Sequence, residues 1–232
     1  MLLTARREKR MLELEEEIGS LNGKVDIFPA DLGKSGERMK LFESISKIHP
    51  VDILINNAGF GWYGYFHRMQ WDTARQMFAV NMEAIAHLTS LFLPGMLERK
   101  SGHIINIGSI AGGFPNQGIA MYSASKAFLD AFTTSLHREL RGSGVHASVM
   151  RLGPVKTEFY NQARVLENGG SIPAESLAVG VDRVNQSLWR LLNRPRRVMY
   201  VPGWLWISQF AEPFLGNIVD SLGPLLLRKT EK

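Results

Sequence analysis

The sequence predicts one α/β domain with a mostly parallel sheet covered by helices on both faces. Short apolar runs alternate with stretches of helical periodicity along almost all of the 232 residues. The run at 51–55 opens directly into the turn NNAGFG (56–61), which suits the end of a strand. No internal repeat, low-complexity segment or obvious linker divides the chain. We therefore expect a single domain over 1–232.

In the first half of the chain, strands and helices are expected to follow one another closely. Leu2 to Thr4 reads as the end of a strand, and the helix that follows has Met11, Leu14 and Ile18 at helical spacing. Pro94 is expected to bend or end the long third helix. The other expected strands are 25–28 and 51–55, and the expected helices are 7–19, 35–48 and 71–98.

The second half continues the alternation. The expected strands are 103–109, 145–152 and 197–203, and the expected helices are 122–141 and 176–193. Residues 158–175 are the best loop candidate, with Asn168, Gly169, Gly170 and Ser171 at its weakest point.

Composition bounds the class of protein. Hydrophobic residues make up 45% and charged residues 21%, as in ordinary globular proteins. The chain has no cysteine, which excludes disulfides and thiolate chemistry and leaves no clue to the redox compartment. The net charge of +5 fits a soluble surface with a basic lean, or alternatively an anionic ligand or membrane surface. The N-terminus lacks the hydrophobic core of a secretory signal.

Candidate chemistry begins with Tyr122 and Lys126, which stand four residues apart in a predicted helix. That spacing places both side chains on one helix face. A lysine cation favours the phenolate form of a neighbouring tyrosine and lowers its pKa, so that the pair could act as an acid/base. Ser109 ends the preceding strand, where ligands bind in a doubly wound sheet. The Tyr/Lys spacing by itself occurs on many helices. It becomes specific only together with the other motifs of the chain.

Six motifs stand in one order along the chain, and together they resemble the classical short-chain dehydrogenase/reductase family over essentially its whole length. They are ADL (30–32), NNAG (56–59), Asn81 in VNM, Ser109 in IGS, YSASK (122–126) and GPVKT (153–157). The resemblance implies a Rossmann-like doubly wound α/β fold and hydride transfer between a nicotinamide cofactor and a carbonyl or alcohol.

The same resemblance implies a role for each matched residue. Tyr122 would exchange the proton at the substrate oxygen, Lys126 would lower the tyrosine pKa and hold the nicotinamide ribose, and Ser109 would position the carbonyl. Asn81 would hold a water relay, or alternatively would only bend its helix. The expected cofactor contacts are Asp31 and Leu32 at the adenine, Asn57, Ala58 and Gly59 at the adenosine side, and Val155 and Thr157 at the carboxamide. No metal ligand set is expected.

Residues after the strand end at 2–4, which corresponds to the second strand of the family fold, favour NADP(H) over NAD(H). In this fold an acidic residue there bonds the ribose 2′-hydroxyl, whereas a basic residue suits a 2′-phosphate. This chain has Ala5 at the position of the acid, followed by Arg6 and Arg7. A guanidinium matches phosphate geometry well. Alternatively one arginine only solvates the helix start, which we expect of Arg7 before Arg6.

The sequence departs from the family at its front and at two later positions. It contains no turn of the form T-G-x-x-x-G-x-G, whose backbone would cradle the pyrophosphate. It therefore looks N-terminally truncated, starting within the second strand, through a misplaced start or as a natural fragment. We expect the chain as given to bind NADPH weakly or not at all. Gly108 stands where a serine is common, and Leu152 where a proline is common.

Aromatic residues beyond the 51–55 strand suggest an apolar substrate site. They are Trp62, Tyr63, Tyr65 and Phe66, and Gln117, Gly118, Ile119 and Met121 precede Tyr122. With 158–175 as a lid, they favour a hydrophobic ketone or aldehyde and its alcohol. The alternative is that these aromatics are plain core.

The C-terminal segment 202–232 is apolar but interrupted by Glu212, Pro213, Asp220 and Pro224, so a spanning helix is not expected. It either packs on the domain or at an oligomer interface, or it lies on an anionic membrane surface with its basic end at Lys229 and Lys232. We expect a cytoplasmic homo-oligomer, a dimer or tetramer, with peripheral membrane contact as an alternative and no nucleic-acid partner.

Two functions follow from these residues. The first is an NADP(H)-dependent oxidoreductase acting on a hydrophobic carbonyl/alcohol pair. The second is a cofactor-deficient fragment that serves as a non-catalytic binding or scaffold protein. Ser109, Tyr122 and Lys126 favour the first, and the absent glycine-rich turn favours the second.

Overall fold

The strands form two separate parallel sheets in the computed structural model, which describes residues 1–170 and 173–228. In the smaller sheet, β1 (Leu2–Leu3) pairs with β2 (Asp26–Ile27). The larger sheet has the order β3-β4-β5-β6, and every adjacent pair is parallel. Its strands are β3 (Ile53–Asn56), β4 (Gly102–Ser109), β5 (Val145–Leu152) and β6 (Val198–Val201). The α/β parallel fold predicted from the sequence is confirmed.

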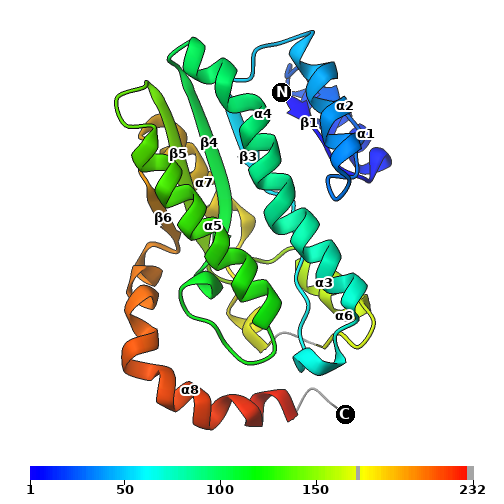
Figure 1. Cartoon of the computed structure of the whole chain (residues 1–232). Helices are drawn as coiled ribbons and strands as arrows, with labels where there is room; N and C mark the ends of the chain where they lie inside the picture. The colour runs from blue at the N-terminus through cyan, green and yellow to red at the C-terminus, as the bar shows by residue number, and fades with distance from the viewer. Residues whose placement is uncertain (171–172, 229–232) are drawn as a thin grey trace.

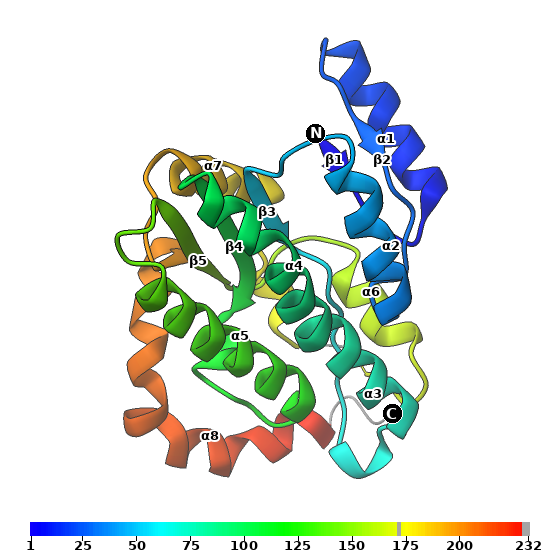
Figure 2. The ribbon, with the colours of Figure 1, turned by 45° about the horizontal axis from the view of Figure 1, so that its top comes forward.

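Helices cover both faces of the larger sheet (Figure 1). On one face lie α4 (Ala84–Glu98) and α5 (Ala120–Glu139), and α7 (Val181–Asn193) lies on the other. Beside the smaller sheet run α1 (Glu8–Ser20) and α2 (Ser35–Ser46) (Figure 2). The parallel strands therefore all end at one edge of the molecule, where the polar motifs follow.

Burial on both faces explains the apolar character of the central strands. Ile104 and Ala147 pack with Met96 and Leu136 beneath α4 and α5. Ile105, one residue along β4, instead packs against Leu191 of α7. Because side chains alternate along a strand, neighbouring residues of β4 serve two different cores.

The two sheets share a core but have no ladder between them. Leu2 of β1 and Leu54 of β3 both pack on a cluster from α2 and α4 that includes Leu41 and Leu88. β1 and β3 are not paired, and the side chains of Ile53 and Ile55 are 45% and 40% exposed. The expected N-terminal truncation is not confirmed, since the structure opens with a strand at Leu2, and it stays a prediction.

The long third helix is interrupted at a place the sequence did not predict. A π-helical turn, η2 (Ala79–Glu83), separates α3 (Trp71–Phe78) from α4. Pro94 lies inside α4 without ending it, so of the two expected effects the ending of the helix was wrong. Phe92 and Met96 on either side of the proline are buried, and their packing holds the helix against the sheet.

By length and composition, the stretch Trp71–Glu98 is apolar enough to cross a membrane, and it is the one such helix within the described ranges. Its apolar residues have another explanation in this fold. Leu88 and Phe92 pack in the shared core with α2, and Met96 packs beneath β4 and β5. This burial is typical of the core helix of a globular domain.

The expected loop 158–175 is partly helical. It contains α6 (Phe159–Val165), in which Tyr160 and Ala163 are buried, and η4 (Pro173–Leu177) follows. The loop prediction was therefore wrong for these residues, because burying two side chains one turn apart stabilises a short helix. Ser171 of the expected weak point lies outside the described residues.

The C-terminal segment forms η5 (Gly203–Phe210) and α8 (Ala211–Arg228), which extends along one end of the domain in both views (Figures 1 and 2). Pro213 is tolerated because it falls in the first turn of α8. The exposed apolar side chains here are Trp204, Trp206, Ile207, Phe210, Phe214, Leu215 and Ile218. Lys229 and Lys232 lie outside the described residues.

Candidate active site

Tyr122 and Lys126 lie on one face of α5, as their spacing predicted, and the face turns toward the end of β4. The Lys126 ammonium is 5.7 Å from the centroid of the Tyr122 ring. Its Nζ donates a hydrogen bond of 2.8 Å to the carbonyl oxygen of Ile107 in β4. The lysine therefore ties α5 to the strand that carries Ser109.

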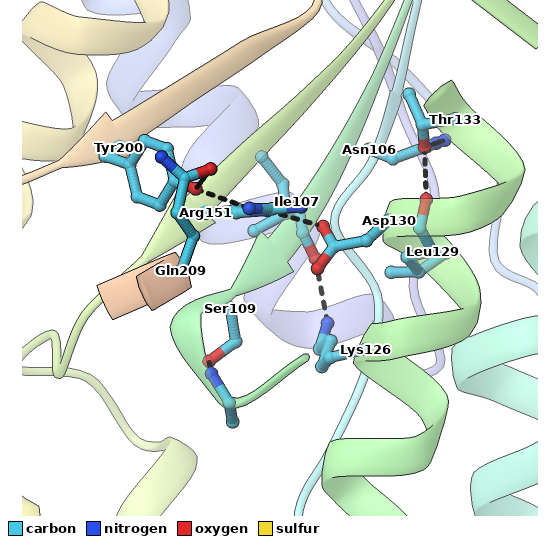
Figure 3. Close-up of polar contacts among 11 residues, drawn as sticks. Asn106, Ile107, Ser109, Lys126, Leu129, Asp130, Thr133, Arg151, Tyr200 and Gln209 are labelled. Carbon is cyan, nitrogen blue, oxygen red and sulfur yellow. Dashed lines mark hydrogen bonds and ion pairs between the residues drawn. The ribbon is translucent and has the colours of Figure 1, made fainter. Parts of the chain in front are cut away.

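Ser109 is the last residue of β4, and its side chain lies near the Lys126 end of the site (Figure 3). Its Oγ accepts a hydrogen bond of 3.2 Å from the backbone N–H of Ala111, which starts the short helix η3 (Ile110–Gly112). The hydroxyl also forms a hydrogen bond with the Tyr122 side chain. Two groups able to bind one substrate oxygen are thus side by side.

Burial dominates the protonation of both α5 residues. It raises the pKa of Tyr122 to about 12, against a lowering by the Ser109 hydrogen bond, and Tyr160 raises it further. Burial lowers the pKa of Lys126 to about 8, and the negative charge of Asp130 opposes that change. Lys126 is not among the causes of the Tyr122 shift, contrary to our expectation. Its ammonium is directed at the Ile107 carbonyl instead of the phenol oxygen.

Asn81 sits in the π-helical turn and is fully buried. Its Nδ2 donates to the carbonyl of Phe60 at 2.9 Å, and its Oδ1 accepts from the Phe60 N–H at 3.1 Å. It also contacts Ser125 Oγ at 3.2 Å. The wider turn places this amide against the loop after β3, so Asn81 fixes that loop onto α5.

Gly59 comes close to the same residues. A Cβ added at Gly59 would lie 3.1 Å from Asn81 Oδ1 and 3.9 Å from Lys126 Nζ. Asn57 and Ala58 before it are exposed at the end of β3. The structure therefore brings NNAG, Asn81 and Lys126 together, and a side chain at Gly59 would fill the space above the lysine.

Asp31 and Leu32 lie after β2 at the same edge. The Asp31 carboxylate accepts a hydrogen bond of 3.0 Å from the Gly33 N–H, and its own N–H donates to Glu37 at 2.5 Å. Leu32 is nearly buried and belongs to the shared core. Both residues are held in a fixed turn rather than on a free loop.

Arg6 and Arg7 follow β1 and differ in their partners. Arg7 forms an ion pair of 2.7 Å with Glu158, which Arg10 also contacts at 3.3 Å. Within residues 1–170 and 173–228, the Arg6 guanidinium forms no ion pair or hydrogen bond, and it is exposed. Of the two, Arg6 is the one able to bind a phosphate without first losing a partner.

Val155 and Thr157 follow β5. Val155 forms a parallel bridge with Val179, and Thr157 is exposed with its Oγ1 accepting a 3.3 Å hydrogen bond from the Phe159 N–H. The Phe159 ring lies 5.5 Å from the Tyr122 ring. Phe159 also lies against the loop after β3, because a Cβ at Gly61 would be 2.5 Å from its ring. The segment after β5 therefore meets Tyr122 and that loop at one place.

A chain of buried amides behind the site was not predicted. Asn56 Nδ2 donates to Asn106 Oδ1 at 2.8 Å, and Asn106 Nδ2 donates to Thr133 Oγ1 at 2.8 Å. These bonds join β3, β4 and α5 below the loop that carries NNAG. The signal in the sequence was an asparagine inside each of two apolar runs, ILIN and IINI.

Arg38 is a second residue that sequence reasoning missed. It is fully buried in α2 and donates to His87 Nδ1 at 2.9 Å and to the Leu32 carbonyl at 2.7 Å, and it pairs with Glu83. It thus fixes the turn at Leu32 to α4. Its place in a charged helical stretch gave no sign of burial.

Gly108, one of the departures from the family pattern, has a packing reason. A Cβ at this position would lie 2.7 Å from Cγ2 of Val149 on the neighbouring strand. Glycine lets β4 and β5 approach at that point, just before Ser109. As for metals, no group of three or more His, Asp or Glu side chains that could hold an ion is found among the described residues.

Comparison with known proteins agrees with this geometry. The family model described as short chain dehydrogenase matches residues 1–167. The chain belongs to the short-chain dehydrogenase family. A relative, the NADP-dependent 3-hydroxy acid dehydrogenase YdfG of Escherichia coli K12, is 31% identical over 206 residues, covering 85% of this chain and 81% of the relative. The ketoacyl reductase HetN of Nostoc sp. PCC 7120 is 35% identical over 159 residues, covering 67% and 54%.

Solved structures share the fold of this short-chain dehydrogenase. A short-chain dehydrogenase from Sphingobium yanoikuyae in complex with NADPH has a TM-score of 0.81 at 24% identity, covering 95% of this chain and 84% of that one. The serine dehydrogenase of Escherichia coli has a TM-score of 0.71 at 27% identity, covering 86% and 84%. The chain is therefore an enzyme of the oxidoreductase class with a Rossmann-like fold.

Proposed function

We propose that this short-chain dehydrogenase is an NADP(H)-dependent oxidoreductase that interconverts a hydrophobic ketone or aldehyde and its alcohol. The observation that carries the proposal is the meeting of Ser109, Tyr122 and Lys126 at the end of β4. The bound nicotinamide would supply or accept the hydride.

The residues of the chain divide the remaining work. The Ser109 hydroxyl binds the substrate oxygen, and Tyr122 gives a proton to that oxygen during reduction and takes it back during oxidation. The Lys126 ammonium holds the ribose of the nicotinamide. Asn81 holds the loop at Phe60 in place, which keeps the open space over Gly59 and Lys126 free for the cofactor ribose.

For the cofactor's other end, we propose that Arg6 binds the 2′-phosphate, with Arg7 contributing less because it is paired with Glu158. Asp31, Leu32, Asn57 and Ala58 would line the adenosine. NADP dependence in the name of the relative YdfG supports this choice over NAD(H). The pyrophosphate of the cofactor has no proposed binding group, because the sequence contains no glycine-rich turn of the family's form.

The substrate side is proposed to be apolar. Phe159 packs beside Tyr122, and half-buried Ile119 and Met121 precede it. Trp62 and Tyr63 are buried, and Trp62 donates to the Glu167 carbonyl at 3.0 Å, so these two serve the core instead of the pocket. Gln117 donates to the Val219 carbonyl at 3.0 Å, which supports a proposed role for α8 at the edge of this apolar side.

A second candidate is a cofactor-deficient protein that binds a partner without catalysis. The unpaired edges of β1 and β3 favour it, because a nucleotide site between two unconnected sheets is less rigid than one on a continuous sheet. In this case the intact Ser109, Tyr122 and Lys126 would be inherited and unused.

An NADPH titration of the purified 232-residue protein separates the candidates, followed by NADPH oxidation with a panel of apolar ketones and aldehydes. Micromolar affinity together with carbonyl turnover supports the oxidoreductase. Turnover that persists unchanged in Tyr122→Phe would remove the mechanism. Absence of binding at millimolar NADPH supports the second candidate.

The wider biology is also a proposal. We propose a cytoplasmic homo-oligomer, a dimer or tetramer, that covers the exposed aromatic residues Trp204, Trp206 and Phe214. The alternative occupant of that surface is an anionic membrane. Sedimentation equilibrium and flotation with anionic liposomes distinguish the two, because the first requires no lipid.

A further inference from the structure

Helix α5 carries a third buried ionisable side chain, Asp130, one helical turn after Lys126. The two residues are 8% and 6% exposed. Residues four apart on a helix are neighbours on one face. Figure 3 shows both side chains projecting from α5 toward the end of β4. An acidic group therefore accompanies the active-site lysine inside the protein.

Asp130 is held in place from the sheet. Its Oδ1 accepts a hydrogen bond of 2.9 Å from Nε of Arg151 in β5. Arg151 in turn donates to the hydroxyl of Tyr200 in β6, and its guanidinium lies 5.3 Å from the centroid of the Tyr200 ring. Three elements thus fix the direction of one carboxylate (Figure 3).

The other carboxylate oxygen, Oδ2, is buried and has no hydrogen-bond partner. Gly112 closes over it: a Cβ there would lie 2.7 Å from Oδ2 and 2.8 Å from the backbone carbon of Lys126. A buried acceptor without a donor is costly. A positive charge close by lowers that cost, and beside Arg151 the Lys126 ammonium supplies one.

Apart from Asp130, the described groups around Lys126 carry no negative charge that could stabilise its ammonium. On α5 its neighbours along the helix face are Tyr122 and Asp130, and on β4 it contacts the Ile107 carbonyl. The neutral amide of Asn81 in η2 lies across the space above Gly59 from it. Arg151 and Tyr200 lie behind Asp130. Asp130 is thus the acidic side chain that acts on Lys126 among the described residues.

We propose that Asp130, clamped by Arg151 and Tyr200, is a positioning residue that keeps the Lys126 ammonium charged and directed toward the active site. Lys126 donates to Ile107 and not to Asp130, so the carboxylate acts through space and leaves the other two N–H groups of the ammonium free for the cofactor ribose. This inference rests on the proposed function for its purpose, but not for its test.

The protonation of both partners supports the assignment. Burial lowers the Lys126 pKa, and Asp130 works against that lowering. Burial raises the Asp130 pKa, and Arg151 and Lys126 work against that rise. Each group therefore stabilises the charged form of the other, and without Asp130 the lysine would lose its proton at a lower pH.

The first test follows Lys126 directly by NMR in protein labelled with [13Cε]lysine, with the signal assigned by Lys126→Arg. Wild type should titrate with a pKa of about 8. Asp130→Asn should lower that midpoint by about one pH unit or more, and Asp130→Glu should restore most of it. Asp182→Asn, on the exposed start of α7, is the control and should leave it unchanged.

The reciprocal experiment does not depend on the fold of Asp130→Asn. Coupling between two sites is equal in both directions. In [13Cγ]aspartate-labelled Lys126→Met, the Asp130 midpoint should therefore rise by as much as the Lys126 midpoint falls in Asp130→Asn. An unchanged Asp130 midpoint, or an unchanged Lys126 midpoint in a folded Asp130→Asn protein, overturns the proposal.

Neither titration needs substrate or cofactor, so failure of the proposed oxidoreductase activity cannot be mistaken for failure of this inference. If turnover is measurable, the alkaline limb of the kcat–pH profile in Asp130→Asn should move to lower pH together with the Lys126 midpoint. A purely structural role would lower kcat at all pH values and leave the limb in place.

Discussion

The proposed catalytic part of the site and the proposed 2′-phosphate part are built very differently. The proposed catalytic residues Ser109, Tyr122 and Lys126 stand on β4 and α5, whose side chains are buried in two cores and joined by amide hydrogen bonds from Asn56 to Thr133. Arg6 and Arg7, proposed to face the 2′-phosphate, follow a strand of the two-stranded sheet and are exposed, and Met11 is the buried residue of the neighbouring α1.

The difference shows how sheet size controls the rigidity of a site. A strand paired on both sides and covered on both faces has few ways to move. A two-stranded sheet is marginal without packing against other elements, and here the contact is the shared core of α2 and α4. We therefore expect the catalytic geometry to be preorganised and the geometry around the 2′-phosphate to be the variable part.

The largest expected effect is on chemistry in the rigid half. Tyr122→Phe should lower kcat for carbonyl reduction by between about 10²- and 10⁴-fold, because the proton donor is lost. Stopped-flow or steady-state NADPH oxidation measures it, and Tyr63→Phe, in the core, is the matched control. A loss of the same size in Tyr63→Phe would mean that aromatic packing, not proton transfer, limits the rate.

Hydrogen exchange compares the two halves directly. Amides of Ile105 and Val149 in the centre of the larger sheet should exchange about a hundredfold or more slowly than those of Leu2 and Ile53 beside the unpaired edges. Mass spectrometry of peptic fragments or NMR gives the rates. Equal protection would show that a partner covers those edges in solution and that the two sheets do not differ in rigidity.

Acid should destabilise the larger sheet through His103. Burial and His146 lower its pKa to about 4 from 6.5. The folded state then holds neutral imidazole while the unfolded chain binds a proton, so stability is lost as pH falls from 6.5 toward 4. The free energy of unfolding by urea should drop by about 3 kcal/mol over this range.

Two variants test whether His103 causes this loss of stability. His103→Gln should remove most of the slope, because glutamine can still bond the Ser148 hydroxyl that His103 contacts at 2.8 Å. His49→Gln, an exposed residue after α2, should leave the slope as in wild type. A slope that survives in His103→Gln would assign the acid sensitivity to other groups.

The smallest effect is expected at the exposed arginines. Arg6→Ala should reduce the preference for NADPH over NADH by about tenfold, the equivalent of one charge-assisted phosphate contact. Arg7→Ala should change it less, because Arg7 is already paired with Glu158. NMR titration measures both dissociation constants even when they are millimolar. Equal losses in the two variants would mean that both guanidinium groups reach the phosphate.

Much of the fold and the catalytic site could be predicted because the signals are local. Alternation of apolar runs and helical stretches predicted the parallel sheet, and four-residue spacing placed Tyr122 and Lys126 on one face. Pro94 does not end its helix, because the packing of its neighbours outweighs local propensity. The helix α6 was missed because burial of Tyr160 is a tertiary event.

By itself, the sequence determined the order of the motifs along the chain and the family. It also determined that Ser109, Tyr122 and Lys126 lie at one edge of the sheet. These follow from periodicity and from parallel strands ending together. Only the tertiary structure decided which side chains have a partner or a fixed place. It pairs Arg7 with Glu158, puts Asn81 in a π-helical turn and brings the charge of Asp130 to bear on Lys126. Desolvation and pairing depend on residues distant in sequence, and no local pattern records them.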